Sequence, residues 1–281
     1  MEKGYHVRGM DLLFIGNIPF GSGLSSSAAI ELTTAVAAAT LSENFTEKGI
    51  DLVQMALIGQ TAEHTFCNVH CGIMDQCASA MGKKDHAILL DCASLKYKYV
   101  PLDLGNYMLV LANTCKKHAL GASAYNKRRE EVAEGLLRMN HALDENRVNL
   151  CDFNETDYWR AEAKLGSDKV KDRIKHVIFE NERVKKAVSI LENGDLKSFG
   201  KILCEAHESI RDLYEVTGPE LDAMFEIASH TDGCIGSRMT GAGFGGCTVN
   251  IVQKESVDAF IHTVGNTYTA QTGITPEFYV C

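Results

Sequence analysis

Residues 19–29 read PFGSGLSSSAA, a loop of small residues that leads into a run rich in Ala and Leu. The run predicts a helix over residues 28–41, and the apolar residues 10–15 before the loop predict a buried strand. Glycine lets a backbone approach a phosphate closely, and the free N–H groups of a first helical turn point at such an anion. The stretch therefore predicts a phosphate-binding loop between a strand and a helix.

Two common phosphate motifs are excluded for this loop. Its glycines are not followed by Gly-Lys-Ser/Thr, as a Walker A loop requires, and the third glycine of a dinucleotide fingerprint is absent. Taken without the rest of the chain, a flexible glycine–serine linker explains the same residues equally well.

Two further segments carry candidate chemistry. Residues 71–76 read CGIMDQ and place one acid, Asp75, among apolar and small residues. An acid in such surroundings is usually paired or serves as a base toward a substrate hydroxyl, and a helix cap is the simpler alternative. Residues 238–247 read RMTGAGFGGC, a glycine-rich turn that can present backbone N–H groups to an anion or form a tight hairpin.

The composition limits the class of protein. With 45% hydrophobic and 23% charged residues, the 281-residue chain can bury a core for one large domain or two ordinary ones. Its formal charge of −9 and its lack of long Lys/Arg clusters argue against nucleic acid as a partner. It has no run of eighteen or more apolar residues, so we expect no membrane partner and a soluble, cytoplasmic monomer with reduced cysteines.

The pattern of expected elements changes along the chain. Helices and strands alternate in the first part, whereas amphipathic helices dominate after residue 125 and strands return near the end. We place a boundary near Gly105, which gives an α+β protein with domains over residues 1–104 and 105–281. The expected helices cover residues 28–41, 51–66, 125–140, 169–192, 196–214, 219–229 and a segment from 256, and the expected strands cover residues 10–15, 87–91, 97–100, 107–113, 235–240, 247–252 and 278–281.

The phosphate loop, the CGIMDQ segment and the glycine-rich turn, in this order, resemble those of the GHMP kinases, and their details resemble the galactokinases. The triple serine at residues 25–27, AEHTF at residues 62–66 and YNKRR at residues 125–129 carry the closer similarity, which spans nearly the whole chain. The resemblance implies a two-domain GHMP kinase fold of the α+β class. Its N-terminal, ATP-binding domain would be ribosomal S5 domain 2-like and incomplete here, and its C-terminal domain would be ferredoxin-like α+β.

The resemblance also implies a reaction and its residues. Galactokinases transfer the γ-phosphoryl group of ATP to the anomeric hydroxyl of α-D-galactose, with Mg²⁺, in galactose catabolism by the Leloir pathway. Asp75 is implied as the catalytic base, and Glu63 and Ser27 as the residues that face Mg²⁺. Gly72 and Tyr125 are implied, with Asp75, to contact the sugar. The residues implied to bind ATP are Gly21, Ser22, Gly23, Leu24, Ser25, Ser26 and Ser27.

Two departures from the galactokinases bear on this expectation. Asn68 stands where they commonly have Gly, a change that a left-handed backbone position can tolerate because Asn adopts it more readily than most residues. The family signature, which resembles Gly-Arg-x-Asn-Leu-Ile-Gly-Glu-His-x-Asp-Tyr and supplies an arginine beside the catalytic aspartate, should lie well before Met10 and is not found. We therefore expect a truncated galactokinase. The alternatives are a non-catalytic regulator that binds galactose and ATP, and a GHMP kinase for a related sugar such as N-acetylgalactosamine.

Overall fold

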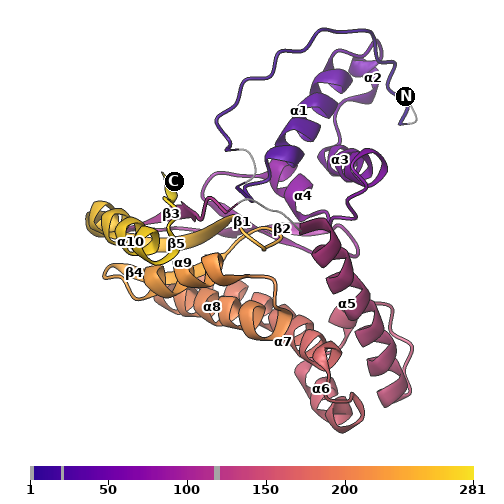
Figure 1. The fold of residues 1–281 in the computed structure, drawn as a ribbon. Helices are drawn as coiled ribbons and strands as arrows, with labels where there is room; N and C mark the ends of the chain where they lie inside the picture. Colours follow the sequence, from indigo (N-terminus) through magenta and orange to yellow (C-terminus); the bar gives the residue numbers. More distant parts are fainter. Residues whose placement is uncertain (1–2, 20–21, 117–120) are drawn as a thin grey trace. The chain divides into compact units, whose positions relative to one another are not determined.

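The computed structural model describes residues 3–19, 22–116 and 121–281 (Figure 1). The chain divides into two compact units, residues 1–102 and residues 103–281. The division falls close to the boundary proposed near Gly105. Each unit has its own hydrophobic cores, and we describe each by itself.

The first unit is mainly helical. Asp51 caps the N-terminus of helix α3 (Leu52–Phe66), because its carboxylate accepts hydrogen bonds from the N–H groups of Val53 (2.9 Å) and Gln54 (3.1 Å). The helices are α1 (Ser26–Thr40), α2 (Phe45–Lys48), α3 (Leu52–Phe66) and α4 (Met74–Met81), followed by the antiparallel strands β1 (His86–Leu90) and β2 (Tyr97–Pro101).

Helices α1, α3 and α4 pack against one another around two small cores. Leu32 of α1 and Met55 of α3 are buried together with Tyr5, and Ala56 of α3 is buried with Cys77 of α4. This packing fixes how the polar residues of the three helices meet.

The strand expected over residues 10–15 is wrong. These residues form no regular element, and Leu13 and Ile15 are 87% and 90% exposed. In the described part of the first unit, strands β1 and β2 pair only with each other, and residues 10–15 pair with neither. A strand needs a partner for its backbone N–H and C=O groups, which the apolar pattern alone cannot supply.

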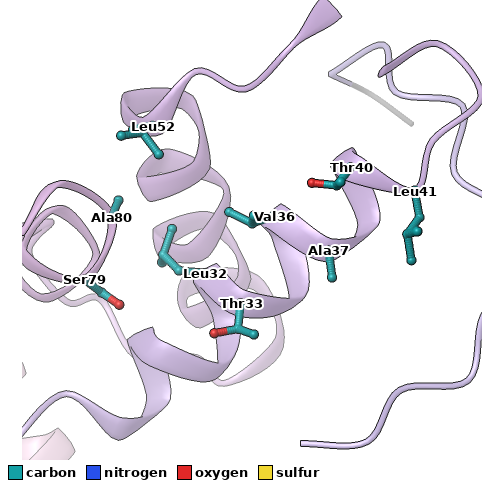
Figure 2. Close-up of a pocket in the computed structure, with 9 residues that line it drawn as sticks. All are labelled: Leu32, Thr33, Val36, Ala37, Thr40, Leu41, Leu52, Ser79 and Ala80. Atoms are coloured by element: carbon teal, nitrogen blue, oxygen red, sulfur yellow. The ribbon is translucent and has the colours of Figure 1, made fainter. Parts of the chain in front are cut away.

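A pocket of about 480 Å³ lies along α1 in the first unit (Figure 2). The residues that line it are mostly apolar, and none of them is implied in catalysis or ligand binding. The lining residues are Leu32, Thr33, Val36, Ala37, Thr40, Leu41, Leu52, Ser79 and Ala80. The residues implied in catalysis and ligand binding therefore lie outside this pocket.

The second unit combines a sheet with many helices. The expected strand 107–113 and the expected helices 169–192 and 219–229 are confirmed with the same bounds. The elements are β3 (Tyr107–Asn113), α5 (Gly121–Leu143), η1 (Leu150–Asp152), α6 (Glu155–Ala161), η2 (Glu162–Lys164), α7 (Lys169–Glu192), α8 (Leu196–Ser209), η3 (Ile210–Tyr214), α9 (Pro219–Ser229), β4 (Cys234–Met239), β5 (Cys247–Gln253), η4 (Lys254–Ser256), α10 (Val257–Thr272) and β6 (Glu277–Val280).

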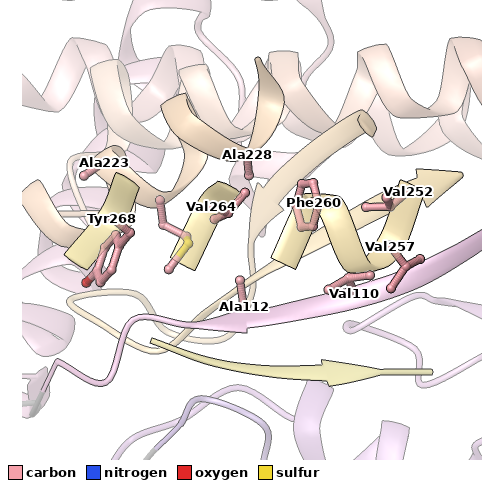
Figure 3. Packing of buried hydrophobic residues seen from close by; sticks show 10 residues of the cluster. Val110, Ala112, Ala223, Ala228, Val252, Val257, Phe260, Val264 and Tyr268 are labelled. Atoms are coloured by element: carbon pink, nitrogen blue, oxygen red, sulfur yellow. The ribbon is translucent and has the colours of Figure 1, made fainter. Parts of the chain in front are cut away.

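The sheet of the second unit is antiparallel, with strand order β4-β5-β3-β6. The central pair is in register from Tyr107 opposite Gln253 to Asn113 opposite Cys247. Helices α9 and α10 pack on this sheet, and Phe260 and Val264 of α10 face Val110 and Ala112 of β3 (Figure 3). All of these apolar side chains are fully buried, so this core holds the sheet and the two helices together.

Helices α5, α6 and α7 share a second core, which includes the buried side chains of Phe153, Tyr158 and Ile174. The helix expected over residues 196–214 is α8, and its last turn widens into η3, a π-helical turn. In the described ranges no helix has the length and apolar character to cross a membrane. None of the ten cysteines, all of which lie in the described ranges, forms a disulfide here.

Candidate active site

The N-terminus of α1 is arranged to receive an anion. Gly23 and Ser25 have left-handed backbones, with φ of 74° and 59°, and Ser25 stands at the N-cap position. The Ser25 side chain makes no capping hydrogen bond, and the first turn of α1 contains no acidic residue. The positive end of the helix dipole and the first N–H groups are therefore not neutralised locally, which favours binding of a phosphate.

The other loop residues are placed as follows. Ser22 is buried and its hydroxyl donates to the carbonyl oxygen of Pro19 at 2.9 Å, so it holds the loop itself. Ser27 is exposed in the first turn of α1. Gly21 lies outside the described residues.

Three polar side chains meet where α1, α3 and α4 pack together. Gln76 of α4 donates from Nε2 to Oε2 of Glu31 of α1 at 3.1 Å, and Glu31 also shares a hydrogen bond with Glu63 of α3. Glu63 and Gln76 are buried, and Oε1 of Gln76 is buried with no hydrogen-bond partner among the residues that the structure describes. We call Glu31, Glu63 and Gln76 the polar cluster.

The polar cluster is rich in negative charge. Burial, the hydrogen bond with Glu63 and the charges of Glu63 and Asp75 raise the pKa of Glu31 to about 7, against the smaller opposite effect of the Gln76 amide. Two carboxyl groups that share a hydrogen bond need a proton between them. A cation bound here would relieve the same crowding.

Asp75 lies in the first turn of α4, next to Gln76. Asp75 is half-buried. Gln76, which follows it in the sequence, and Glu63 of α3 are more deeply buried. The N-cap of α4 is Ile73, which makes Asp75 a residue of the first turn rather than the helix cap. An acid in this position is favoured by the helix dipole.

Side chains of α3 contact the backbone of the segment between α3 and α4. Asn68 has a φ of 54°, a left-handed backbone of the kind that Asn tolerates better than most residues. The carbonyl oxygen of Cys71 lies 3.0 Å from Nε2 of His64 and accepts a hydrogen bond of 3.2 Å from Gln60. Gly72 is exposed, and a β-carbon built on it would meet no atom within 4 Å.

Tyr125 belongs to the second unit, on α5. Burial, followed by the charge that an ionised Tyr125 would carry, raises the pKa of Tyr214 in η3, so the two phenols lie near each other. The guanidinium of Arg128, one turn further along α5, lies 6.0 Å from the ring centre of Tyr214. Tyr125 is thus placed beside the end of η3.

The glycine-rich turn connects β4 and β5 in the second unit. Four glycines of the turn have positive φ, from 81° at Gly241 to 132° at Gly245, and Phe244 has a φ of 59°. The Phe244 N–H donates to the carbonyl oxygen of Val216 at 2.7 Å. Thr114 donates its N–H (2.9 Å) and hydroxyl (2.8 Å) to Gly246. The turn is therefore a fixed loop and not a minimal two-residue hairpin.

Sequence reasoning missed Glu31 and Gln76. Glu31 follows Ser27 by four residues on α1, so the two lie on one helix face about 6 Å apart along the axis. The four-residue spacing from Ser27 could therefore have indicated that Glu31 lies near the predicted phosphate-binding loop. Nothing in the sequence pairs Glu31 with Gln76, which is 45 residues away.

The donor set of the first unit suits magnesium. In the described part of the chain, no three His, Cys, Asp or Glu side chains are arranged to hold a metal ion by themselves. Mg²⁺ in kinases is commonly held by one or two carboxylates together with substrate phosphates and water. The buried Glu63 carboxylate and the exposed Ser27 hydroxyl are oxygen donors, the type of ligand that Mg²⁺ prefers.

Comparison with known proteins first gives the class. Residues 1–83 match the family model for the GHMP kinases N-terminal domain, and residues 187–270 match that for the GHMP kinases C-terminal domain. The fold agrees, because a crystal structure of mevalonate kinase aligns with a TM-score of 0.59 at 18% identity, covering 94% of this chain and 66% of that one.

Closer relatives give the family. The chain is 48% identical to the galactokinase of Clostridium tetani over 99% of its own length and 70% of that protein, and 42% identical to that of Bacillus subtilis over the same shares. The crystal structure of Lactococcus lactis galactokinase complexed with galactose has a TM-score of 0.88 and 38% identity, covering 94% of this chain and 67% of that one. The chain belongs to the galactokinases.

Proposed function

We propose that this chain catalyses ATP-dependent phosphorylation of galactose at its anomeric hydroxyl, giving galactose 1-phosphate and ADP. One observation carries the proposal. Glu31 is joined to Glu63 and influenced by Asp75, and it stands one helical turn from the anion-ready start of α1. Acidic groups and a phosphate-binding helix end therefore occur side by side within the first unit, as a phosphoryl transfer site requires.

The proposed reaction uses the residues in separate roles. Residues 22–27 and the first N–H groups of α1 hold the phosphates of ATP. Asp75 accepts the proton of the anomeric hydroxyl while the oxygen of that hydroxyl forms a bond to the γ-phosphorus. The bond from the γ-phosphorus to the β-phosphate oxygen breaks and ADP is released. Gly72 lets the sugar approach the backbone, and Tyr125 is proposed as a further sugar contact.

Magnesium is part of the proposal. Glu63 and Ser27 would hold the ion, which neutralises charge on the transferred phosphoryl group when bound. Gln76 and Glu31 orient Glu63 through the hydrogen bonds of the polar cluster. These residues thus prepare the carboxylate before any ligand arrives.

The test is a coupled assay of ADP release with galactose, ATP and Mg²⁺. It uses this chain and a chimera that adds the part of the Clostridium tetani galactokinase that the chain does not match, in that protein's own order. Replacing Asp75 by Asn should lower kcat by at least about 100-fold, which is the smaller end of what a general base supplies. Asp11→Asn, at an exposed position of the same unit, is the matched control.

The possible outcomes separate the alternatives. Galactose-dependent ADP release that Asp75→Asn abolishes supports the proposal. Absence of ADP release in both forms, with galactose or ATP binding retained in calorimetry, would instead indicate a non-catalytic regulator. Faster turnover of N-acetylgalactosamine than of galactose would indicate a kinase for that related sugar.

A further inference from the structure

A buried arginine joins three elements of the second unit. Arg173 of α7 is 1% exposed, and it donates from Nε to Glu131 of α5 at 2.8 Å. It also donates to the carbonyl oxygen of Leu213 in η3, and from Nη2 to Glu215 at 2.6 Å. A guanidinium has a fork of donors in fixed geometry, so it can satisfy all three partners at once.

Arg128 of α5 completes this network. It forms an ion pair with Glu131 and donates from Nη2 to the backbone carbonyl of Glu215 at 3.3 Å. Glu215 is therefore held through both its side chain and its backbone, and Lys169 at the start of α7 also pairs with its carboxylate.

The backbone of Glu215 needs this support. Its φ is 55°, in the left-handed region that a residue with a β-carbon adopts at a cost. Its N–H donates to the carbonyl oxygen of Ile210 at 2.7 Å and so ends the π-helical turn η3. The direction of the chain after η3 thus depends on a strained residue that arginines hold in place.

The next residue reaches the glycine-rich turn. The carbonyl oxygen of Val216 accepts the hydrogen bond from Phe244, and a β-carbon at Gly243 would lie only 2.1 Å from that oxygen. A shift of Val216 would therefore move the turn or break its contact. The path from Arg173 to the turn consists of one ion pair, one peptide unit and one hydrogen bond.

We propose that Arg173 is a positioning residue that fixes the glycine-rich turn, residues 240–246, through Glu215 and Val216. Its role in catalysis rests on the proposed function and on the expectation that the N–H groups of this turn can be presented to an anion. Its role in ordering the turn follows from contacts inside the second unit. The two parts can be tested separately.

The test of ordering is amide hydrogen exchange, followed by mass spectrometry, on the full chain. In Arg173→Met we expect exchange across residues 240–246 to become about tenfold faster, because the Phe244 N–H loses its fixed acceptor. Arg138→Met is the matched control. Arg138 likewise joins a carboxylate of α5, Glu134, to Asp168 at the start of α7, with no contact to Glu215.

Equal exchange of residues 240–246 in Arg173→Met and Arg138→Met would overturn the proposal. Glu215→Gln keeps the proposal testable if Arg173→Met does not fold, because Glu215 is partly exposed and the change removes the negative charge that pairs with Arg173. Faster exchange of the turn in Glu215→Gln is expected, and unchanged exchange would count against the proposal.

Steady-state kinetics test whether the path from Arg173 through Glu215 to the turn affects catalysis. In the ADP-release assay, Glu215→Gln should lower kcat about tenfold with little change in the KM for galactose. The reason is that the N–H groups of a less ordered turn would stabilise the anionic transition state less, while galactose binding would be unaffected. An unchanged kcat in an active preparation would overturn the catalytic role. If the wild-type form releases no ADP, the proposed function fails while the exchange experiment still decides the ordering role.

Discussion

Gly243 and Val216 approach so closely that a β-carbon on Gly243 would lie 2.1 Å from the Val216 carbonyl oxygen. Gly243 also has a φ of 84°, so two independent constraints demand glycine there. The contact joins two loops that are distant in sequence, one after η3 and one between β4 and β5. The glycine at position 243 is therefore required for the packing of the two loops, whether or not the turn binds a ligand.

Replacing Gly243 by Ala should destabilise the second unit. We expect a loss of about 3 kcal/mol in the free energy of unfolding, from backbone strain plus the clash. Gly194→Ala is the control, since Gly194 has a φ of 71° but open space around its β-carbon position. Urea denaturation measures both variants. Equal losses would show that the contact with Val216 contributes nothing beyond the φ constraint.

Replacing Gly72 by Ala should leave the fold intact. Gly72 has no positive φ and no atom near its β-carbon position, so alanine is tolerated unless a ligand occupies that space. If the sugar approaches there, galactose affinity in calorimetry should fall about tenfold, or roughly 1.4 kcal/mol. Gly16→Ala, equally open and also in the first unit, should not change the affinity. Equal affinities for the two variants would remove Gly72 from the sugar site.

Much of the second unit could be predicted from sequence. Helices α7 and α9 and strand β3 have strong periodicity and clear turn signals at their ends, so their bounds were correct. Residues 10–15 show the limit of this reasoning, because an apolar run predicts burial only where a partner strand exists. Helix α4 was not predicted as a helix, since its eight residues are too few for a periodic pattern.

Some residues of the candidate site could be proposed from the sequence and others could not. Asp75 and Glu63 could be proposed by resemblance, and their neighbourhood is consistent with that proposal. Gln76 and Arg173 could not be singled out. Gln76 meets Glu31 only because α1 packs on α4. Arg173 lies on a charged helix face that reads as solvated, and only the tertiary structure buries it.

The raised pKa of Glu31 predicts a pH-dependent stability. A carboxyl whose pKa is about 7 in the folded chain and 4.5 as its ordinary value stabilises the fold fully below pH 4.5. This contribution is lost as the pH rises through about 7. Glu31→Gln cannot titrate, so relative to wild type its free energy of unfolding should rise by about 1 kcal/mol from pH 5 to pH 8, after allowance for partial solvent exposure.

The measurement for Glu31 is urea denaturation at several pH values between 5 and 8. Glu47→Gln, at an exposed glutamate of α2, controls for the loss of one negative charge. A parallel pH dependence in wild type and Glu31→Gln would show that Glu31 titrates normally in the folded chain.

Magnesium should stabilise the chain only when Glu63 can bind it. With ATP present, adding Mg²⁺ at about 100 times its dissociation constant should stabilise the fold by about 3 kcal/mol, and EDTA should reverse the shift in melting temperature. Glu63→Gln keeps the buried hydrogen-bonding shape but removes the anionic oxygen that a hard cation prefers, so the magnesium-dependent shift should largely disappear. Glu47→Gln removes the same charge from an exposed helix and should keep the shift. Equal magnesium-dependent shifts in Glu63→Gln and wild type would mean that the ion is held elsewhere, and the polar cluster would then be a purely structural link between α1, α3 and α4.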